Sequence, residues 1–304
     1  MEPILVVGGS GFIGTALQKY IKLHNLSDRY TFTYHTSEDK IQEGITKKYL
    51  NLLDENSMNM VNDYHYAIYV AGNSNHGLAF TDPYEDFRQN ALTLMNFLKT
   101  FRGSLVILSS QAVYYGLEGQ IPENTDHVST MPYGFSKQIV ENYCRFHFEK
   151  ALLQNLWIFR LMYTYGEGEK ERRLIPACAR STRNNSVVNI SGGGKSFINP
   201  LPNDFVADVL VTAMNDLMIS REPCLEITNL NHPEKVRVID VLEYLGKLKP
   251  FKYEISEEGE HWPVHFWGDT DNLRGHLERW NKEFPDVYDD LRKYFMGLLQ
   301  NNEG

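Results

Sequence analysis

The chain has 304 residues, of which 42% are hydrophobic, enough to bury the core of one large α/β domain or of a nucleotide-binding domain with a smaller partner. Its formal net charge of -9, without a dense run of Lys or Arg, argues against nucleic acid or a membrane surface as a partner and favours a small-molecule substrate. The N-terminus lacks the pattern of a signal peptide and no stretch has the ~18 apolar residues of a membrane span, so we expect a cytoplasmic protein. Cys144, Cys178 and Cys224 lack metal-ligand spacing, so we expect no metal site.

Short apolar runs alternate with helical periodicity through the first half of the chain. The runs at 4–7, 30–34, 48–50, 67–70, 105–108 and 156–160 are short enough to be strands covered on both faces. This alternation predicts a parallel sheet with helices on both sides, the doubly wound α/β fold of Rossmann type.

A glycine-rich turn follows the first predicted strand. Gly8, Gly11 and Gly14 are three residues apart, and apolar residues at helical spacing begin directly after them. In a strand-turn-helix unit these glycines allow the tight turn, the approach of a pyrophosphate and close packing of helix on strand. We therefore expect the turn, with Phe12 and Ile13 at the helix start, to bind a dinucleotide pyrophosphate. The alternative is an ordinary turn that merely uses glycine.

The second half of the chain has a mixed pattern. Helices are predicted at 174–183, 204–217, 238–248 and 286–299. We predict a dinucleotide-binding domain over 1–165 and a smaller, interleaved, mostly substrate-binding region over 166–304, with a segment at 225–229 returning to the main sheet.

Tyr133 and Lys137 are four residues apart after Pro132, which places both side chains on one face of a predicted helix. A phenol has an unperturbed pKa of about 10, and a nearby ammonium favours its ionised form. Tyr133 is therefore a candidate general acid or base, with Lys137 lowering its pKa and lying near the cofactor ribose. The alternative is a capping aromatic residue and a solvated lysine.

These features resemble, in order along nearly the whole chain, the extended short-chain dehydrogenase/reductase family of nucleotide-sugar epimerases, dehydratases and reductases. The GxxGxxG turn and Tyr133-xxx-Lys137 carry the resemblance, together with segments at 71–73, 109–114, 160–166 and 267–273. The resemblance implies catalytic roles for Tyr133, Lys137 and Ser110, and a cofactor lined by the glycine turn, Lys137 and the residues Asn51, Leu52, Ala71, Gly72 and Asn73.

Two of the matched polar positions have alternatives. Ser110 would hydrogen-bond the oxygen that exchanges a proton with Tyr133, but Ser109 or Gln111 could take that place. Asn90 matches the helix asparagine of the family, and either a cofactor-linked role or simple satisfaction of buried backbone explains it.

The loop after the second strand bears on the cofactor. NAD enzymes usually have an acidic residue there to accept the ribose hydroxyls, whereas this chain has His35, Thr36 and Ser37, and its first acid is Glu38. This pattern favours NADP over NAD, with Lys40 near enough in sequence to help, although His35 could equally be an exposed loop residue.

The residues after Ser110 limit the reaction. The dehydratases of the family have an Asp-Glu pair there, and Gln111-Ala112 cannot do that acid-base work. Reduction or oxidation of a nucleotide-linked sugar is the leading hypothesis, and segments at 34–36, 51–54 and 199–204 resemble the dTDP-4-dehydrorhamnose reductase branch. Epimerisation through a transient ketone is the alternative, and two others are a regulatory subunit without turnover and an oxidoreductase for an alcohol that is not a sugar.

Two departures from the family pattern concern the substrate. Phe197 stands where epimerases have a diphosphate-binding arginine, which Lys195, Arg180 or Arg183 could replace. Tyr163 replaces the asparagine of the RxxNxYG segment. The resemblance also implies a homodimer that pairs helices across a two-fold axis.

Overall fold

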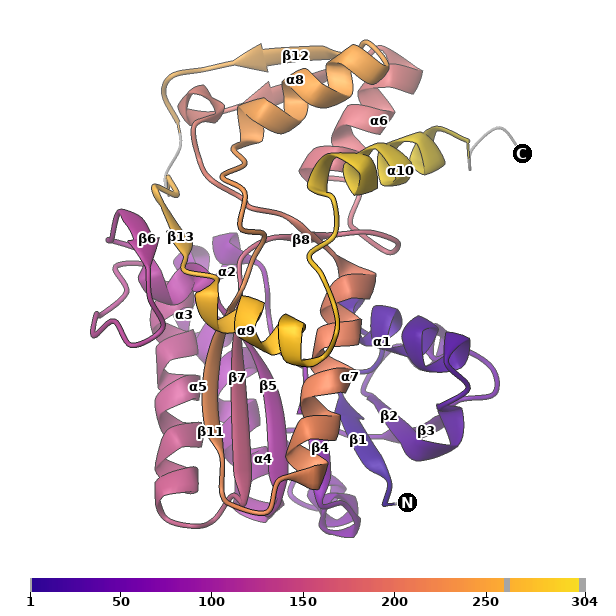
Figure 1. Ribbon diagram of the computed structural model, residues 1–304, viewed down its shortest axis with the longest axis vertical. Coiled ribbons are helices and arrows are strands. Elements are labelled where there is room, and N and C mark those ends of the chain that lie inside the picture. Colours follow the sequence, from indigo (N-terminus) through magenta and orange to yellow (C-terminus); the bar gives the residue numbers. More distant parts are fainter. Residues whose placement is uncertain (1, 260–262, 301–304) are drawn as a thin grey trace. The chain divides into compact units, whose positions relative to one another are not determined.

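The computed structural model describes residues 2–259 and 263–300 and divides the chain into two compact units (Figure 1). Unit 1 comprises the described residues through 116, together with 123–161 and 204–229. Unit 2 comprises 117–122, 162–203 and the described residues from 230 onward. Compared with the predicted division at 165, residues 204–229 lie in unit 1 and residues 117–122 in unit 2. Within the described ranges, no helix is long and apolar enough to cross a membrane.

Unit 1 is built on a seven-stranded sheet with the order β11-β7-β5-β4-β1-β2-β3. Six of these strands pair in parallel, and β11 forms the edge beside β7. The predicted doubly wound α/β fold is confirmed, since the order reverses at β1 as in dinucleotide-binding sheets. The strands are β1 (Ile4–Val7), β2 (Tyr30–Tyr34), β3 (Thr46–Tyr49), β4 (Tyr66–Tyr69), β5 (Ser104–Ser110), β7 (Asn155–Leu161) and β11 (Leu225–Leu230).

Side chains alternate between the two faces of this sheet, and both faces are buried at the central strand β1, whereas the edge strand β3 is mostly exposed. On one face Leu5 and Val7 of β1 join a core with residues of α4 and α5, including Phe97 and Cys144. Residues Ile4 and Val6 point to the other side and are also fully buried. There α1 and α7 lie together, where the Tyr20 hydroxyl donates to Asp208 at 2.6 Å (Figure 1). The helices of unit 1 are α1 (Phe12–Leu23), α2 (His76–Thr81), α3 (Pro83–Phe87), α4 (Thr93–Thr100), α5 (Pro132–Glu149) and α7 (Asn203–Ile219), with a π-helical segment, η4 (Arg88–Leu92), between α3 and α4.

Unit 2 contains short strand pairs and a separate helical core. Residues of α6, α8 and α10, including Cys178, Leu242 and Phe295, form this core. Its strand pairs are β6 (Gly119–Ile121) with β13 (Phe266–Gly268), β8 (Thr164–Tyr165) with β10 (Leu201–Pro202), and β9 (Val187–Ile190) with β12 (Lys252–Ile255). Its helices are α6 (Leu174–Asn184), α8 (Val238–Leu248), α9 (Asp271–Arg279) and α10 (Val287–Gln300).

Candidate active site

The glycine-rich turn between β1 and α1 is held against β2. The Gly9 N–H donates to the Thr33 carbonyl at 2.9 Å, and the Gly8 N–H donates to the Thr33 hydroxyl at 3.2 Å. Gly8 has a φ of +92°, which only glycine adopts readily, and a Cβ there would lie 2.7 Å from the backbone of Ala71. A Cβ on Gly14 would lie 2.3 Å from the Gly9 carbonyl oxygen. No side chain fits at either position without moving the backbone.

Helix α1 begins at this turn with unsatisfied N–H groups. Its N-cap is Gly11, no side chain caps it, and its first turn contains no acidic residue. The backbone at Phe12 and Ile13 and the positive end of the helix dipole therefore suit an anion such as a pyrophosphate. The chain's own geometry thus fits the dinucleotide that the sequence predicts.

The other residues expected to line the cofactor follow the neighbouring strands at the same edge of the sheet. His35 and Thr36 are exposed and Ser37 is half-buried in the loop after β2. Asn51 and Leu52 follow β3, where their backbone groups bond to nearby side chains. Both loops lie apart from Tyr133 in the order of the sheet, because β2 and β3 are on the far side of β1 from β5.

The turn after β4, residues 71–73, lies next to both the glycine-rich turn and Lys137 of α5. A Cβ on Gly8 would touch Ala71, and a Cβ on Gly72 would lie 3.5 Å from Lys137 Nζ and 2.6 Å from Asn90 Oδ1. This Asn90 oxygen is buried and has no hydrogen-bond partner among the described residues. Asn73, the third residue of the turn, donates through Nδ2 to Asp86 at 2.9 Å.

Tyr133 and Lys137 lie on the first turns of α5, which starts at Pro132, where the missing N–H of proline costs nothing. Lys137 Nζ is 5.8 Å from the centre of the Tyr133 ring, and both side chains are buried. Ser110, at the end of β5, hydrogen-bonds Tyr133, and its Oγ accepts from the Ala112 N–H at 3.1 Å. The structure therefore brings together the three residues that the sequence predicts as catalytic.

Burial has the largest effect on the pKa values of Tyr133 and Lys137. It raises the pKa of Tyr133 well above its ordinary value, which the hydrogen bond from Ser110 partly offsets and the charge of Asp86 reinforces. Burial also lowers the pKa of Lys137 to about 8, against the charges of Asp86 and Glu141. Burial thus acts against the charged form of both side chains.

Two further side chains lie at this group, and the sequence analysis did not identify them. The His76 ring at the start of α2 lies 4.7 Å from the Tyr133 ring, centre to centre. Asp86 of α3 is buried and bonds to Ser136, the neighbour of Lys137. Only the four-residue spacing from Asp86 to Asn90 could have signalled that both face the same side of a helix.

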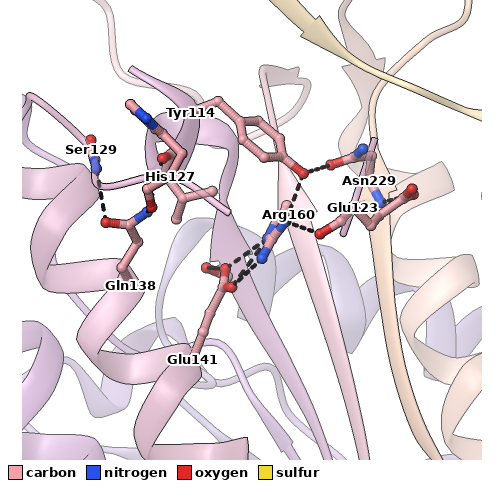
Figure 2. Close-up of polar contacts among 10 residues, drawn as sticks. Tyr114, Glu123, His127, Ser129, Gln138, Glu141, Arg160 and Asn229 are labelled. Carbon is pink, nitrogen blue, oxygen red and sulfur yellow. Dashed lines mark hydrogen bonds and ion pairs between the residues drawn. The ribbon is translucent and has the colours of Figure 1, made fainter. Parts of the chain in front are cut away.

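A buried ion pair supports the strand ends beneath the site (Figure 2). Arg160 of β7 donates to both carboxylate oxygens of Glu141 on α5, at 2.7 Å from Nη2, and to the Tyr114 hydroxyl at 2.7 Å. The Tyr114 hydroxyl in turn donates to Asn229 at 2.8 Å. Ser109 donates to Glu141 at 2.5 Å, so its hydroxyl is engaged in this network rather than with Tyr133.

Unit 2 contains a cavity of about 270 Å³ on one side of α6. Aliphatic side chains form most of its wall, joined by the Tyr163 ring, the polar Asn189 and Ser191, and the exposed Arg172. The Tyr163 hydroxyl donates to Glu169 at 3.1 Å, and the Arg173 guanidinium lies 4.4 Å from the Tyr163 ring centre.

The cations suggested as substitutes for a diphosphate-binding arginine are engaged elsewhere in unit 2. Lys195 pairs with Glu257 at 2.7 Å, Arg180 donates to the Glu171 carbonyl and Arg183 donates to the Leu298 carbonyl.

A sheet of Rossmann order, a glycine turn that fits a pyrophosphate and a buried Tyr-Lys-Ser group define a dinucleotide-dependent α/β enzyme. The chain belongs to the NAD dependent epimerase/dehydratase family, whose model matches residues 4–214. This match confirms the resemblance to the extended short-chain dehydrogenase/reductases and an NAD-dependent enzyme of that kind. No curated protein sequence matches the chain.

Solved structures of nucleotide-sugar enzymes share this fold. A UDP-glucose 4-epimerase is 18% identical with a TM-score of 0.85, covering 100% of this chain and 99% of its own. The UDP-glucuronic acid 4-epimerase from Bacillus cereus, solved with UDP-glucuronic acid and NAD, is 16% identical with a TM-score of 0.83, covering 98% of this chain and 99% of its own. MoeE5, solved with UDP-glucuronic acid and NAD, is 19% identical with a TM-score of 0.82, covering 97% of this chain and 98% of its own.

Proposed function

We propose that the protein is a nucleotide-sugar epimerase that inverts a hydroxyl-bearing sugar carbon through a transient ketone. The observation that carries the proposal is the buried group of Tyr133, Ser110 and Lys137 beside the glycine turn. Membership of the family supports it, and so do structural neighbours that are UDP-sugar 4-epimerases. The reductase hypothesis, with its resemblance to the dTDP-4-dehydrorhamnose reductases, has no such neighbour among the structures described above.

Tyr133, Ser110 and Lys137 each have a different role in the proposed proton transfer. Bound NAD would supply the acceptor and donor of the hydride. Tyr133 takes the proton of the sugar hydroxyl when the ketone forms and returns it when the alcohol is restored on the other face. Ser110 holds the reacting oxygen against the phenol, and the Lys137 charge favours the ionised form of Tyr133 during the transfer. No net oxidation or reduction results, because the hydride and the proton both return to the sugar.

We propose NAD rather than the NADP that the β2 loop favoured. Glu38 follows directly after that loop, and its bond with Lys47, at 2.9 Å, holds the pKa of Glu38 below its ordinary value. A stable carboxylate in this position would repel a 2′-phosphate. The structures with bound dinucleotide among the neighbours contain NAD. NADH is therefore expected to bind more tightly than NADPH in a fluorescence titration, and tighter NADPH binding would restore the NADP hypothesis.

We assign the nucleoside of the substrate to the cavity of unit 2. The aliphatic wall and the Tyr163 ring suit the faces of a base, while Asn189 and Ser191 can bond to its polar edge. Arg172, which lines the same cavity, has the charge that a diphosphate requires. Titration with UDP should show binding that Arg172→Ala weakens. Lys195→Ala, which removes a cation already paired with Glu257, should bind UDP as the wild type does.

The direct test of the proposed reaction uses purified protein with NAD and UDP-sugars. UDP-glucose and UDP-glucuronic acid should each be assayed by chromatography for conversion to the 4-epimer, without net formation of NADH. Epimer formation in the wild type and its loss in Tyr133→Phe would support the proposal. Stoichiometric NADH consumption with a keto sugar, and no epimer, would instead favour the reductase. Absence of any turnover despite dinucleotide binding would favour the regulatory subunit.

We also propose a homodimer and a cytoplasmic location, the settings expected from the family and from the sequence. Support for a dimer comes from α5, where Phe135 and Phe146 are about half exposed and lie eleven residues apart, on one side of the helix. Exposed aromatic residues at this spacing suit a helix that pairs with its copy.

A further inference from the structure

Asp86 is a buried carboxylate at the centre of a hydrogen-bond network in unit 1. Only 1% of this residue is exposed. Its Oδ1 accepts from the amides of Asn73 and Asn90, both at 2.9 Å, and its Oδ2 accepts from the Ser136 hydroxyl at 2.8 Å. All three of these partners donate, which is the pattern that an ionised carboxylate requires. A lone buried carboxylate would be costly, so a positive partner nearby is expected.

The network joins three segments around Lys137. Asn73 belongs to the turn after β4, Asn90 to the π-helical segment η4, and Ser136 directly precedes Lys137 on α5. A Cβ on Gly72 would lie 2.6 Å from Asn90 Oδ1 and 3.5 Å from Lys137 Nζ, so these two atoms border the same small space. Asp86 therefore bonds to Asn90 and Ser136, which border Lys137, and its charge is close enough to act on the ammonium.

The other ionisable groups around Lys137 are few in this part of the unit. Tyr133 and Glu141 lie on the same helix, and Glu141 is already bound to Arg160 at 2.7 Å. The ring of His76 on α2 lies 4.7 Å from the Tyr133 ring, centre to centre. Glu85 and Arg88, the charged neighbours of Asp86 in sequence, pair with each other at 2.7 Å. Glu141 thus has a bonded cation, whereas the described contacts of Asp86 include none.

We propose that Asp86 is a positioning residue of the active site, whose buried charge keeps Lys137 in its ammonium form and whose hydrogen bonds align Lys137 with Tyr133. The inference rests on the proposed function, because it gives Asp86 a part in the proton transfer by Tyr133. The charges of Asp86 and Glu141 both oppose the effect of burial on the Lys137 pKa, in agreement with this role. The consequence is a Lys137 that stays charged at neutral pH although its side chain is buried.

Asp86→Asn removes the charge and can keep the network. Oδ1 of the new amide still accepts from Asn73 and Asn90. Its Nδ2 can donate to Ser136 Oγ, because the Ser136 hydroxyl has a second acceptor, the Tyr133 carbonyl, at 2.9 Å. Ser136→Ala is the matched control, since it removes one hydrogen bond of Asp86 and leaves the charge. Thermal melting checks that each variant folds. If Asp86→Asn does not fold, Asp86→Ser provides a smaller neutral side chain for the same test.

The decisive measurement is the Lys137 pKa, followed by NMR of protein labelled with ¹³C,¹⁵N-lysine and assigned by its loss in Lys137→Arg. The neutral variant should lower this pKa relative to the wild type, and Ser136→Ala should leave it nearly unchanged. The alkaline limb of kcat/KM should move to lower pH in Asp86→Asn only, with turnover at pH 8 reduced about fivefold, the change in the ammonium fraction at that pH when the pKa falls by about one from about 8.

The outcomes separate this inference from the proposed reaction. An unchanged Lys137 pKa in Asp86→Asn, or the same change in Ser136→Ala, would overturn the role of Asp86 whatever the enzyme catalyses. A lowered Lys137 pKa in a protein without epimerase turnover would support the charge assignment and refute the reaction alone.

Discussion

Lys137 is a buried cation, so its charge lowers the stability of the folded chain. Its pKa of about 8 lies below the ordinary value of 10.5, which means that the unfolded chain binds this proton more tightly. The stability of the wild type relative to Lys137→Met should therefore be lowest below pH 8. It should rise between pH 8 and 10.5 and then level off, because the amine is then neutral in both states. Denaturant unfolding of both proteins across this range tests the sign, and a difference that falls with pH would contradict it.

Tyr133 offers a second test at the scale of one atom. Tyr133→Phe removes the phenol oxygen and keeps the ring and its packing against His76. The glycine-rich turn, which is expected to bind the dinucleotide, is unchanged. We expect kcat to fall by roughly 10²-fold or more, the contribution of a general acid-base group, with dinucleotide affinity within about twofold of the wild type. Stopped-flow turnover and fluorescence titration measure the two quantities. Activity close to that of the wild type would exclude Tyr133 as the proton carrier.

In the β1-turn-α1 unit, substitutions of two glycines should separate an effect on backbone packing from an effect on dinucleotide binding. A Cβ on Gly14 would lie 2.3 Å from a carbonyl oxygen, whereas a Cβ on Gly11 would meet its nearest atom, the Gly8 carbonyl oxygen, at 3.3 Å. Gly14→Ala should therefore cost about 1–3 kcal/mol of stability as well as cofactor binding. Gly11→Ala should melt near the wild-type temperature and lose mainly dinucleotide affinity. Calorimetry with and without NAD tests this, and equal melting of both variants would refute the distinction.

Most strands of unit 1 could be predicted from the sequence because they are short runs of apolar or β-branched residues, whereas β3 is exposed and contains Lys47 and Lys48. The six predicted strands lie close to where they were expected, although β3 begins earlier, at Thr46, and β5 and β7 extend further, to Ser110 and Leu161. The short strand pairs of unit 2 have two to four residues each and no such signal, because only distant partners stabilise them. The positions of Asp86 and His76 near the Tyr133-Lys137 pair could not be predicted from the sequence either, because they depend on α2 and α3 packing against α5.

The whole molecule is expected to be a dimer through α5. Light scattering after gel filtration should give twice the mass of the single chain. Phe146→Asp should give a single chain, because it introduces a charge into the apolar contact. Thr212→Ala, on α7 and away from α5, serves as the control that keeps the wild-type mass. A monomer at all concentrations in the wild type would contradict this assembly.

The buried pair of Arg160 and Glu141 constrains how this sequence can change over time. Removing either partner leaves an unpaired charge in the core, typically at a cost of about 3–5 kcal/mol, a large part of the roughly 5–15 kcal/mol by which native proteins are stable. Replacing both by apolar residues of similar volume is far less costly, but it requires two simultaneous mutations. The two positions are therefore expected to vary together among relatives, so that an alignment should show both residues or neither, even where overall identity is as low as the 16–19% seen with the structural neighbours.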